Sequence, residues 1–244
     1  MDRPDYFERN GRRLAVRRRR GLGPTLLFLP GYMSDMDGGK ATALDGWAAE
    51  RGRAMLRFDY GGCGLSEGRF EDQSLADWRD DALAMIDSID GPVLLVGSSM
   101  GGWLMLLAAL ARPEQIHALV GIAAAPDFTD WGFDAAQKAT LLDAGRLVEP
   151  SPYGESPCVT TRAFWESGES LKLLEGEIAI DCPVRLLHGL DDADVPWRIS
   201  LRLMERLRSA DVQATLIKDG DHRLSREGDL ARLLATADAL LETL

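Results

Sequence analysis

One short stretch, residues 93–104, restricts the possible folds of this chain more than any other. It begins with the apolar run Val93-Leu94-Leu95-Val96, continues through Gly97-Ser98-Ser99-Met100-Gly101 and enters an Ala/Leu-rich segment. A strand, the pattern Gly-x-Ser-x-Gly and a helix, in this order, predict a nucleophile elbow. Glycines flank such a bend because a Cβ there would collide with the strand or the helix, and the bend exposes the side chain of Ser99.

Composition and charge exclude several classes of protein. The chain has 244 residues, 45% of them hydrophobic, which is enough for a sizeable core. Its formal net charge of −11 argues against a general binder of nucleic acid or anionic membranes. The basic run Arg17-Arg18-Arg19-Arg20 follows a turn signal at Asn10-Gly11, so we interpret it as the end of an exposed strand.

Cysteine usage and hydropathy bear on the compartment. Cys63, Cys158 and Cys182 are widely spaced and form no CxxC pair. This pattern favours reduced thiols and argues against a zinc site or a disulfide framework. No apolar stretch approaches the roughly 20 residues of a membrane span, and the first residues carry no signal-peptide pattern. We therefore expect a cytoplasmic protein without a membrane span.

The rest of the chain alternates short apolar runs with helical patterns. A polar hairpin around Asn10-Gly11 is expected at an antiparallel edge of a sheet. The expected strands cover residues 25–29, 54–58, 93–96, 118–123, 184–189 and 214–217, and the helices between and after them include residues 42–51, 75–89, 197–208 and 229–241. This alternation predicts an α/β fold with a mostly parallel sheet and helices on both faces.

Residues 126–181 interrupt this alternation. They show helical fragments, no convincing strand, and the aromatic residues Phe128, Trp131, Phe133, Tyr153, Phe164 and Trp165. Such a segment is too long for a plain crossover, and its aromatic content argues against a disordered insertion. We expect a single domain, residues 1–244, with a helical cap inserted at 126–181.

A nucleophilic serine needs a base, and the chain contains only three histidines. His117 lies between the elbow helix and the next strand, where a structural role is expected. His188 ends a strand and is expected to brace the loop that follows. His222 lies in a loop after the last strand, at the sheet edge where the elbow also lies, so we predict that His222 is the base.

The carboxylate that orients this base is expected in the loop after the preceding strand. Asp191, Asp192 and Asp194 all lie there, and spacing alone does not choose among them. Acyl transfer also needs two N–H donors for the oxyanion. We expect these donors to be the backbone amides of Met100, which follows the nucleophile, and of Tyr32, in the loop after the strand at 25–29.

Several blocks of the sequence resemble the α/β-hydrolase domain family: residues 30–35, 57–66, 97–105, 188–197 and 221–223. They are most similar to its branch of palmitoyl-protein thioesterases and acyl-glucuronide esterases. The resemblance implies an α/β-hydrolase fold with an eight-stranded-type sheet and a small cap. It also implies that the acid is Asp192, the fifth residue of the family pattern H-G-x-x-D-x-x-V-P, and that Asp59 stabilises a turn. Animal members of this branch are mitochondrial, but their location does not transfer to this chain.

The reaction expected is hydrolysis of a carboxylic ester or thioester through an acyl-Ser99 intermediate, without a metal or an organic cofactor. The substrate would be a small molecule or an S-acylated protein. An apolar acyl pocket is expected to be lined by Tyr32, Met33, Met100, Phe128, Trp131, Phe133 and Val195, for which ordinary core packing is the alternative. Other interpretations are a general carboxylesterase or lipase, a C–C bond hydrolase that uses the same serine, histidine and aspartate, and a non-catalytic binding module.

Overall fold

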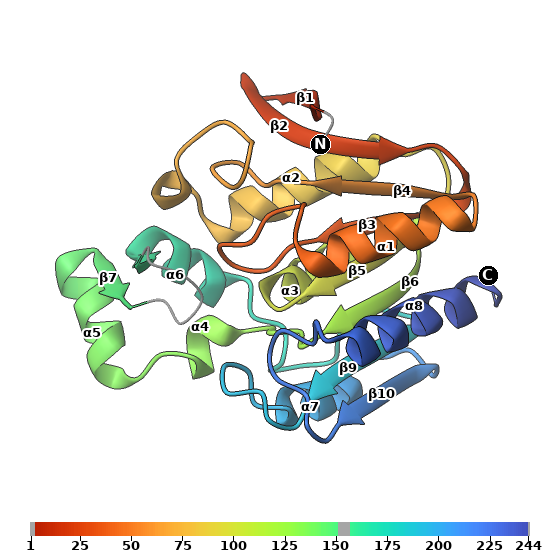
Figure 1. Cartoon of the computed structure of the whole chain (residues 1–244). Coiled ribbons are helices and arrows are strands. Elements are labelled where there is room, and N and C mark those ends of the chain that lie inside the picture. The colour runs from red at the N-terminus through yellow and green to blue at the C-terminus, as the bar shows by residue number, and fades with distance from the viewer. Residues whose placement is uncertain (1–2, 151–156, 244) are drawn as a thin grey trace.

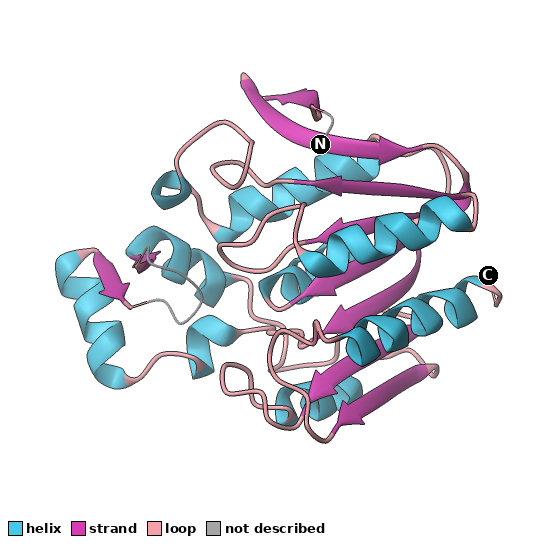
Figure 2. Cartoon of the chain, viewed as in Figure 1, coloured by secondary structure: helices cyan, strands magenta, loops and turns pink. Residues whose placement is uncertain are grey.

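The computed structural model describes residues 3–150 and 157–243, which form a central sheet with helices on both faces (Figure 1, Figure 2). In spatial order the eight strands of the sheet are β1 (Asp5–Arg9), β2 (Arg12–Arg19), β4 (Arg53–Phe58), β3 (Leu22–Leu29), β5 (Val93–Ser98), β6 (Ile116–Ile122), β9 (Val184–Gly189) and β10 (Val212–Ile217). The strands from β4 to β10 in this order are mutually parallel, whereas β2 is antiparallel to both neighbours. The predicted α/β fold with a mostly parallel sheet is confirmed.

The edge of the sheet is the expected hairpin. Asn10 and Gly11 join β1 to β2 with φ values of 48° and 76°. Positive φ at both central residues is typical of a type I′ turn, whose twist matches that of the flanking strands. Two arginines of the run at the end of β2 form ion pairs within the chain: Arg17 with Asp37, and Arg19, whose Nε lies 2.8 Å from an oxygen of Asp45. These guanidinium groups therefore serve the fold itself.

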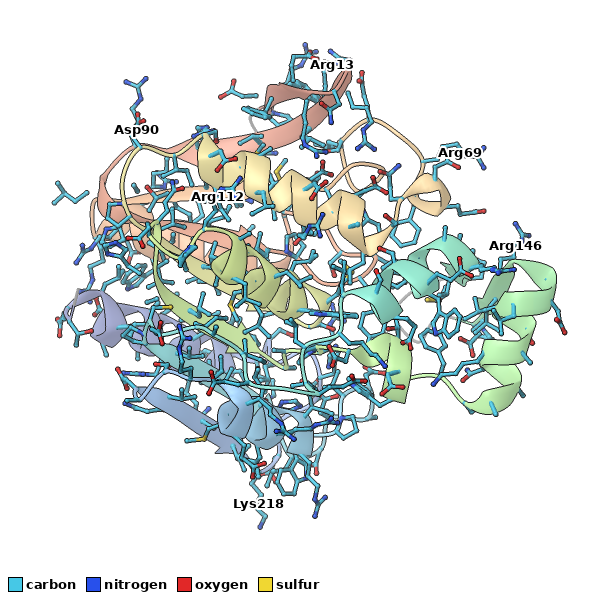
Figure 3. The ribbon with its side chains drawn as sticks, turned by 180° about the vertical axis from the view of Figure 1, so that it is seen from behind. Arg13, Arg69, Asp90, Arg112, Arg146 and Lys218 are labelled. Carbon is cyan, nitrogen blue, oxygen red and sulfur yellow. The ribbon has the colours of Figure 1, made fainter. Side chains whose placement is uncertain are left out.

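Two sets of helices cover the sheet and bury two separate cores. Helices α1 (Gly39–Glu50) and α8 (Glu227–Leu241) lie on one face, and α2 (Leu75–Asp87), α3 (Met100–Ala111) and α7 (Arg198–Arg206) lie on the other (Figure 1). Every residue of β5 is buried, which explains its continuous apolar run. Charged side chains such as Arg13, Arg112 and Lys218 project from the outer surface (Figure 3). In the described part of the chain, no helix is long and apolar enough to cross a membrane.

Between β6 and β9 the chain leaves the sheet and forms a group of elements beyond the carboxyl ends of the parallel strands (Figure 1). They are α4 (Phe128–Trp131), α5 (Ala135–Ala144), β7 (Arg146–Glu149), β8 (Cys158–Thr161) and α6 (Arg162–Ser170), with the short 3-10 helix η1 (Phe70–Asp72) beside β8. We call residues 126–181 the cap; the division of the chain into one domain with this cap remains a prediction. Tyr153 lies outside the described residues.

The prediction that the cap contains no strand was wrong. Strands β7 and β8 pair antiparallel in register from Arg146 opposite Thr161 to Glu149 opposite Cys158. Each strand is only four residues long; β7 has no buried residue and β8 has one, so neither presents a buried apolar face. Such short strands are stabilised by the partner strand and by tertiary contacts rather than by a local pattern, so the sequence carried no signal for them.

Asp127 joins the beginning of the cap to its end. It has left-handed backbone angles, φ 59° and ψ 25°, and its side chain is buried. Its Oδ1 accepts the backbone N–H of Leu173 at 2.8 Å, and its Oδ2 accepts that of Leu174 at 2.7 Å. A single carboxylate thus closes the base of the cap across 47 positions of sequence.

Asp127→Ala is expected to destabilise the cap, because it leaves two backbone N–H groups without an acceptor at a cost of about 1–3 kcal/mol each where they are buried. Limited proteolysis should then cut within the cap faster than in the wild type. Asp127→Asn keeps one acceptor and tolerates the left-handed backbone, so its effect should be intermediate. The exposed neighbour Asp130 provides the control, Asp130→Ala. Equal cutting of the wild type and Asp127→Ala would contradict this role.

Candidate active site

Ser99 occupies the bend between β5 and α3 with φ 54° and ψ −119°, an unusual conformation for a residue other than glycine. The glycines on either side explain how the bend fits. A Cβ on Gly97 would lie 2.4 Å from the carbonyl oxygen of Gly101, and a Cβ on Gly101 would lie 2.0 Å from the carbonyl oxygen of Leu29. Both positions therefore require glycine, and the predicted strand, bend and helix are all present.

Three loops at the carboxyl ends of parallel strands bring Ser99, Asp192 and His222 together. Ser99 follows β5, Asp192 follows β9 and His222 follows β10. The distance between His222 Nε2 and Ser99 Oγ is 3.2 Å, and that between His222 Nδ1 and Asp192 Oδ2 is 2.9 Å. Hydrogen bonds thus form a continuous line from a buried carboxylate through an imidazole to a hydroxyl.

The geometry distinguishes the three candidate acids. Asp191 is exposed, and its backbone N–H donates to the carbonyl oxygen of Gly220. Asp194 is also exposed, and its backbone N–H donates to Asp192 Oδ1 at 2.9 Å. Of these three carboxylates, Asp192, with a fully buried side chain, forms the hydrogen bond with the His222 ring.

The Asp192 carboxylate is surrounded by hydrogen-bond donors. Burial acts to raise the pKa of Asp192, but hydrogen bonds from the rings of His188 and His222 and from the Val195 N–H outweigh it, and the pKa is held far below its ordinary value. Oδ1 accepts the N–H groups of Asp194 and Val195, at 2.9 and 2.8 Å. The group therefore stays ionised despite its burial.

His188 is completely buried at the end of β9 and touches the same carboxylate. Its Nε2 lies 3.2 Å from Asp192 Oδ2. The sequence analysis placed His188 in a bracing role but missed this contact. A signal existed, since His188 and Asp192 are four residues apart across the turn that ends a strand. His117, in contrast, is exposed at the other end of the sheet, in β6.

The two expected oxyanion donors flank Ser99. Met100 begins α3, where the first N–H groups have no partner within the helix. The loop that carries Tyr32 runs past the elbow at Gly31, where a Cβ would lie 3.3 Å from both Ser99 Cβ and the carbonyl oxygen of Ser98. The missing side chain of Gly31 lets the loop come this close. The arrangement can offer two backbone N–H groups to a negative charge developing beside Ser99.

Asp59 holds the loop that carries Tyr32. Its Oδ1 accepts the N–H of Met36 at 2.7 Å and its Oδ2 accepts that of Leu65 at 2.8 Å. Burial raises the pKa of Asp59, although these two N–H groups act in the opposite direction. The residue ties two loops together, in agreement with the structural role that the family resemblance implied.

The side chain of Tyr32 connects its loop to the cap. Its Oη donates to the carbonyl oxygen of Val159, in β8, at 2.8 Å. The ring packs against the rings of Phe70, Trp78, Phe128 and Phe164, with centroid distances between 5.0 and 6.2 Å. Burial strongly raises the pKa of Tyr32, so the phenol stays protonated as a donor.

The residues expected to line an acyl pocket lie in different environments. Met33 is 44% exposed, in the same loop as Tyr32. Phe128 packs against the core, with its ring centroid 6.4 Å from that of Phe133, and Trp131 donates its indole N–H to the carbonyl oxygen of Pro126. Val195 is only 3% exposed and belongs to the core, which leaves little of its side chain to contact a ligand.

One set of potential metal-ligating atoms converges within the described residues, those of Asp192, Asp194 and His222, which lie within 4.8 Å of one another. Asp192 Oδ2 and His222 Nδ1 already bond to each other, so a cation there would have to displace that hydrogen bond. The absence of a metal from the reaction remains a prediction.

Lys40, at the start of α1, supports the loop that carries His222, and the sequence analysis did not identify it. Its Nζ donates to the backbone carbonyl of Arg223, the residue after His222. Burial lowers the pKa of Lys40 to about 8, the charge of Arg223 adds to this effect, and Asp221 opposes it. The ammonium group is thus anchored beside the His222 loop in a poorly hydrated position.

The stability difference between the wild type and Lys40→Met is expected to depend on pH. A lysine with a lowered folded pKa binds fewer protons in the folded state, so its contribution to stability rises with pH between about 8 and 10.4. Urea unfolding at pH 7 and at pH 10 measures this difference, which should shift in favour of the wild type at pH 10. Lys218→Met, at an exposed site (Figure 3), should show no such shift. An equal difference at both pH values would refute the expectation.

Comparisons with known proteins agree with this architecture. The family model Hydrolase_4, described as serine aminopeptidase, S33, matches residues 25–151. The chain is 40% identical to human "Palmitoyl-protein thioesterase ABHD10, mitochondrial", an alignment that covers 100% of this chain and 80% of that protein. Among solved structures, mouse alpha/beta hydrolase domain-containing protein 10 matches with a TM-score of 0.92 and 39% identity over 98% of each chain.

A bacterial structure is similar to the same degree. A putative hydrolase from Agrobacterium vitis S4 matches with a TM-score of 0.91 and 37% identity, covering 97% of each chain. These similarities extend over the sheet and the cap alike, and they confirm the family that the sequence blocks indicated. The chain belongs to the Hydrolase_4 family of α/β-hydrolases.

Proposed function

We propose that the protein is a serine hydrolase that cleaves carboxylic esters or thioesters with apolar acyl groups, through an acyl-Ser99 intermediate. The observation that carries this proposal is the continuous hydrogen bonding from Asp192 through His222 to Ser99 Oγ. A hydroxyl in this arrangement can lose its proton to the imidazole as it attacks, whereas an isolated serine is a poor nucleophile at neutral pH.

In the first half of the reaction, Ser99 Oγ bonds to the carbonyl carbon of the substrate while His222 Nε2 takes the hydroxyl proton. The buried carboxylate of Asp192 accepts the Nδ1–H of His222 and stabilises the imidazolium that forms. The negative charge passes to the carbonyl oxygen, which faces the backbone N–H groups of Tyr32 and Met100. When the tetrahedral intermediate collapses, the alcohol or thiol leaves with the proton from His222.

In the second half, water takes the place of the alcohol or thiol. His222 removes a proton from the water as its oxygen attacks the acyl carbon, and the same two N–H groups meet the second oxyanion. Collapse breaks the bond to Ser99 Oγ, which recovers its proton from His222, and the carboxylic acid is released.

Two observations favour an apolar acyl group, on a small molecule or on an S-acylated protein. The cap and the Tyr32 loop contribute a cluster of aromatic rings beside the elbow, which suits a hydrocarbon better than a sugar. In addition, the human relative is named a palmitoyl-protein thioesterase. These observations favour a thioesterase over the alternatives, which are a general carboxylesterase, a lipase and a C–C bond hydrolase.

A substrate panel tests the proposal. The wild type would be assayed with p-nitrophenyl esters and with matched S-acyl thioesters of graded chain length, and labelled separately with a fluorophosphonate. Turnover is expected to rise with acyl length, and mass spectrometry should find the label on Ser99. Best turnover on acetylated sugars would contradict the acyl preference. Labelling of the native protein at a residue other than Ser99, or no turnover on any ester, would contradict the mechanism and favour another use of the scaffold.

We also propose a cytoplasmic location for the protein. Its support is that all three cysteines are free thiols in the described structure, as expected in a reducing compartment. The human relative is named mitochondrial, and fractionation of the source cells with antibody detection distinguishes the two compartments. Recovery of the protein in an organelle fraction would overturn the cytoplasmic assignment.

A further inference from the structure

His188 has three oxygen neighbours that together specify its protonation. Its Nδ1 lies 2.6 Å from Ser200 Oγ, in α7, and its Nε2 lies 3.0 Å from the carbonyl oxygen of Val195 and 3.2 Å from Asp192 Oδ2. The side chains of His188 and Asp192 are completely buried, and Ser200 is 1% exposed. Each polar atom in this group must therefore find its partner within the group itself.

Only one arrangement of protons satisfies all of these contacts. A carbonyl and a carboxylate accept hydrogen bonds, so the proton of the ring must be on Nε2. Nδ1 is then an acceptor, and the hydroxyl of Ser200 donates to it. A second proton on Nδ1 would leave the buried hydroxyl of Ser200 without an acceptor among the contacts of the described residues.

We propose that His188 is a positioning residue for the proposed Ser99–His222–Asp192 relay: a neutral imidazole that holds the Asp192 carboxylate in the orientation that receives His222. The inference rests on the proposed hydrolase function. The backbone N–H groups of Asp194 and Val195 donate to Asp192 Oδ1, and the Nε2–H of His188 donates to Asp192 Oδ2. The remaining lone pair of Oδ2 is then directed at His222 Nδ1, 2.9 Å away.

The neutral state of His188 matters for the charge of the site. A cationic imidazolium beside Asp192 would neutralise the carboxylate and weaken its attraction for the imidazolium that forms on His222. A neutral donor stabilises the carboxylate without cancelling its charge. Ser200 enforces this state from α7, where it is 1% exposed. The relay is thereby linked to α7.

Kinetics of position-188 variants test the inference in the full-length protein. His188→Leu removes the donor and is expected to lower kcat by about 10- to 100-fold with KM changed less than about twofold. Its pH profile should also change, because the carboxylate that faces His222 loses a donor to its charged form. His188→Gln places an amide N–H near the position of Nε2 and should recover most of kcat and the wild-type pH profile. His117→Leu, at an exposed position, is the matched control.

A second variant and a spectroscopic measurement cover the case in which His188→Leu fails to fold. Ser200→Ala keeps the ring but removes the donor to Nδ1, so kcat should fall by about two- to tenfold with KM unchanged. Nitrogen-15 NMR of the wild type, with only three histidines to assign, should show His188 as the Nε2–H tautomer at pH 7. In Ser200→Ala the Nδ1 resonance of His188 should move because Nδ1 loses its hydrogen-bond donor, while the proton stays on Nε2.

The outcomes separate this inference from the proposed function. If the wild type hydrolyses esters while His188→Leu and Ser200→Ala keep the wild-type kcat and pH profile, the positioning role is wrong and the hydrolase proposal stands. A proton on Nδ1 of His188 in the NMR experiment would overturn the inference by itself. If the wild type hydrolyses no ester and Ser99 resists the fluorophosphonate, the proposed function fails, and the positioning role fails with it.

Discussion

Replacing Ser99 with alanine is expected to lower kcat by about 10⁴-fold or more on any ester that the wild type cleaves. The reason is that the acyl-enzyme route needs an oxygen at this position, and His222 Nε2 has no other side-chain hydroxyl among its contacts in the described residues. Any residual rate would come from the oxyanion donors and from substrate binding. Steady-state kinetics on the preferred p-nitrophenyl ester measure the loss, and fluorophosphonate labelling of the variant should be absent.

The neighbouring residue offers a matched control for this experiment. Ser98 is also a serine of the elbow, buried at the end of β5, and Ser98→Ala should keep kcat within a few fold of the wild type. Alanine has the same Cβ as serine, so Ser99→Ala leaves the strained backbone at φ 54° as it is and should preserve the melting temperature. Turnover by Ser99→Ala at even a tenth of the wild-type rate would exclude the mechanism.

Asp192→Asn is expected to reduce kcat by about 10⁴-fold by a different route, an effect of the size found when an orienting aspartate is amidated in other serine hydrolases. The carboxylate of Asp192 accepts hydrogen bonds on both oxygens, from two backbone N–H groups and two imidazole rings. An asparagine has a single acceptor oxygen, so its NH₂ group must face either the backbone donors or the two rings. If the NH₂ group faces the rings, it donates to His222 Nδ1 and favours the wrong tautomer of His222. If it faces the backbone, it opposes two N–H donors and leaves them without an acceptor.

The same substitution has a predicted pH signature in stability. The folded pKa of Asp192 lies below its unfolded value of about 3.9, so the carboxylate contributes stability that is fully present above that value and is lost as the pH falls through the folded pKa. The advantage of the wild type over Asp192→Asn in the free energy of unfolding should thus be constant from pH 5 to pH 7 and shrink below about pH 4. Urea unfolding at pH 3 and pH 7 measures it.

Asp194→Asn serves as the comparison, because Asp194 is exposed and only two residues away. It should change kcat and the free energy of unfolding little at either pH. If Asp192→Asn kept most of its activity while Asp194→Asn lost it, the orienting carboxylate would have to be reassigned to Asp194. A stability difference for Asp192→Asn that grew toward acid pH would contradict the ionised state of the buried carboxylate.

Local patterns in the sequence were sufficient to predict the central architecture. The apolar strand before Ser99, its two glycines and the helix after it all depend on residues within about a dozen positions of each other. The same holds for the turn at Asn10-Gly11 and for the alternation of strands and helices. Turn chemistry and hydrophobic periodicity act over such short distances, so they can be read without coordinates.

The strands of the cap and the contacts of Tyr32 could not be predicted in this way. Strands β7 and β8 are each four residues long, and their pairing depends on a partner rather than on their own pattern. The bond from Tyr32 Oη to Val159 joins positions 127 apart in the chain. Both features arise from the way in which the cap folds back onto the sheet.

By itself, the sequence determined the nucleophile elbow, the parallel sheet and the short set of residues that can serve Ser99, since these follow from local geometry and from the scarcity of histidine. Spacing left Asp191, Asp192 and Asp194 open as the partner of His222, and the family resemblance pointed to Asp192. Only the tertiary structure showed that Asp192 Oδ2 lies 2.9 Å from His222 Nδ1, that His188 shares this oxygen, and that Lys40 supports the loop of His222. The physical reason is that hydrogen-bond distances at this site depend on loops from distant strands converging to within a few ångströms, and no local pattern encodes that convergence.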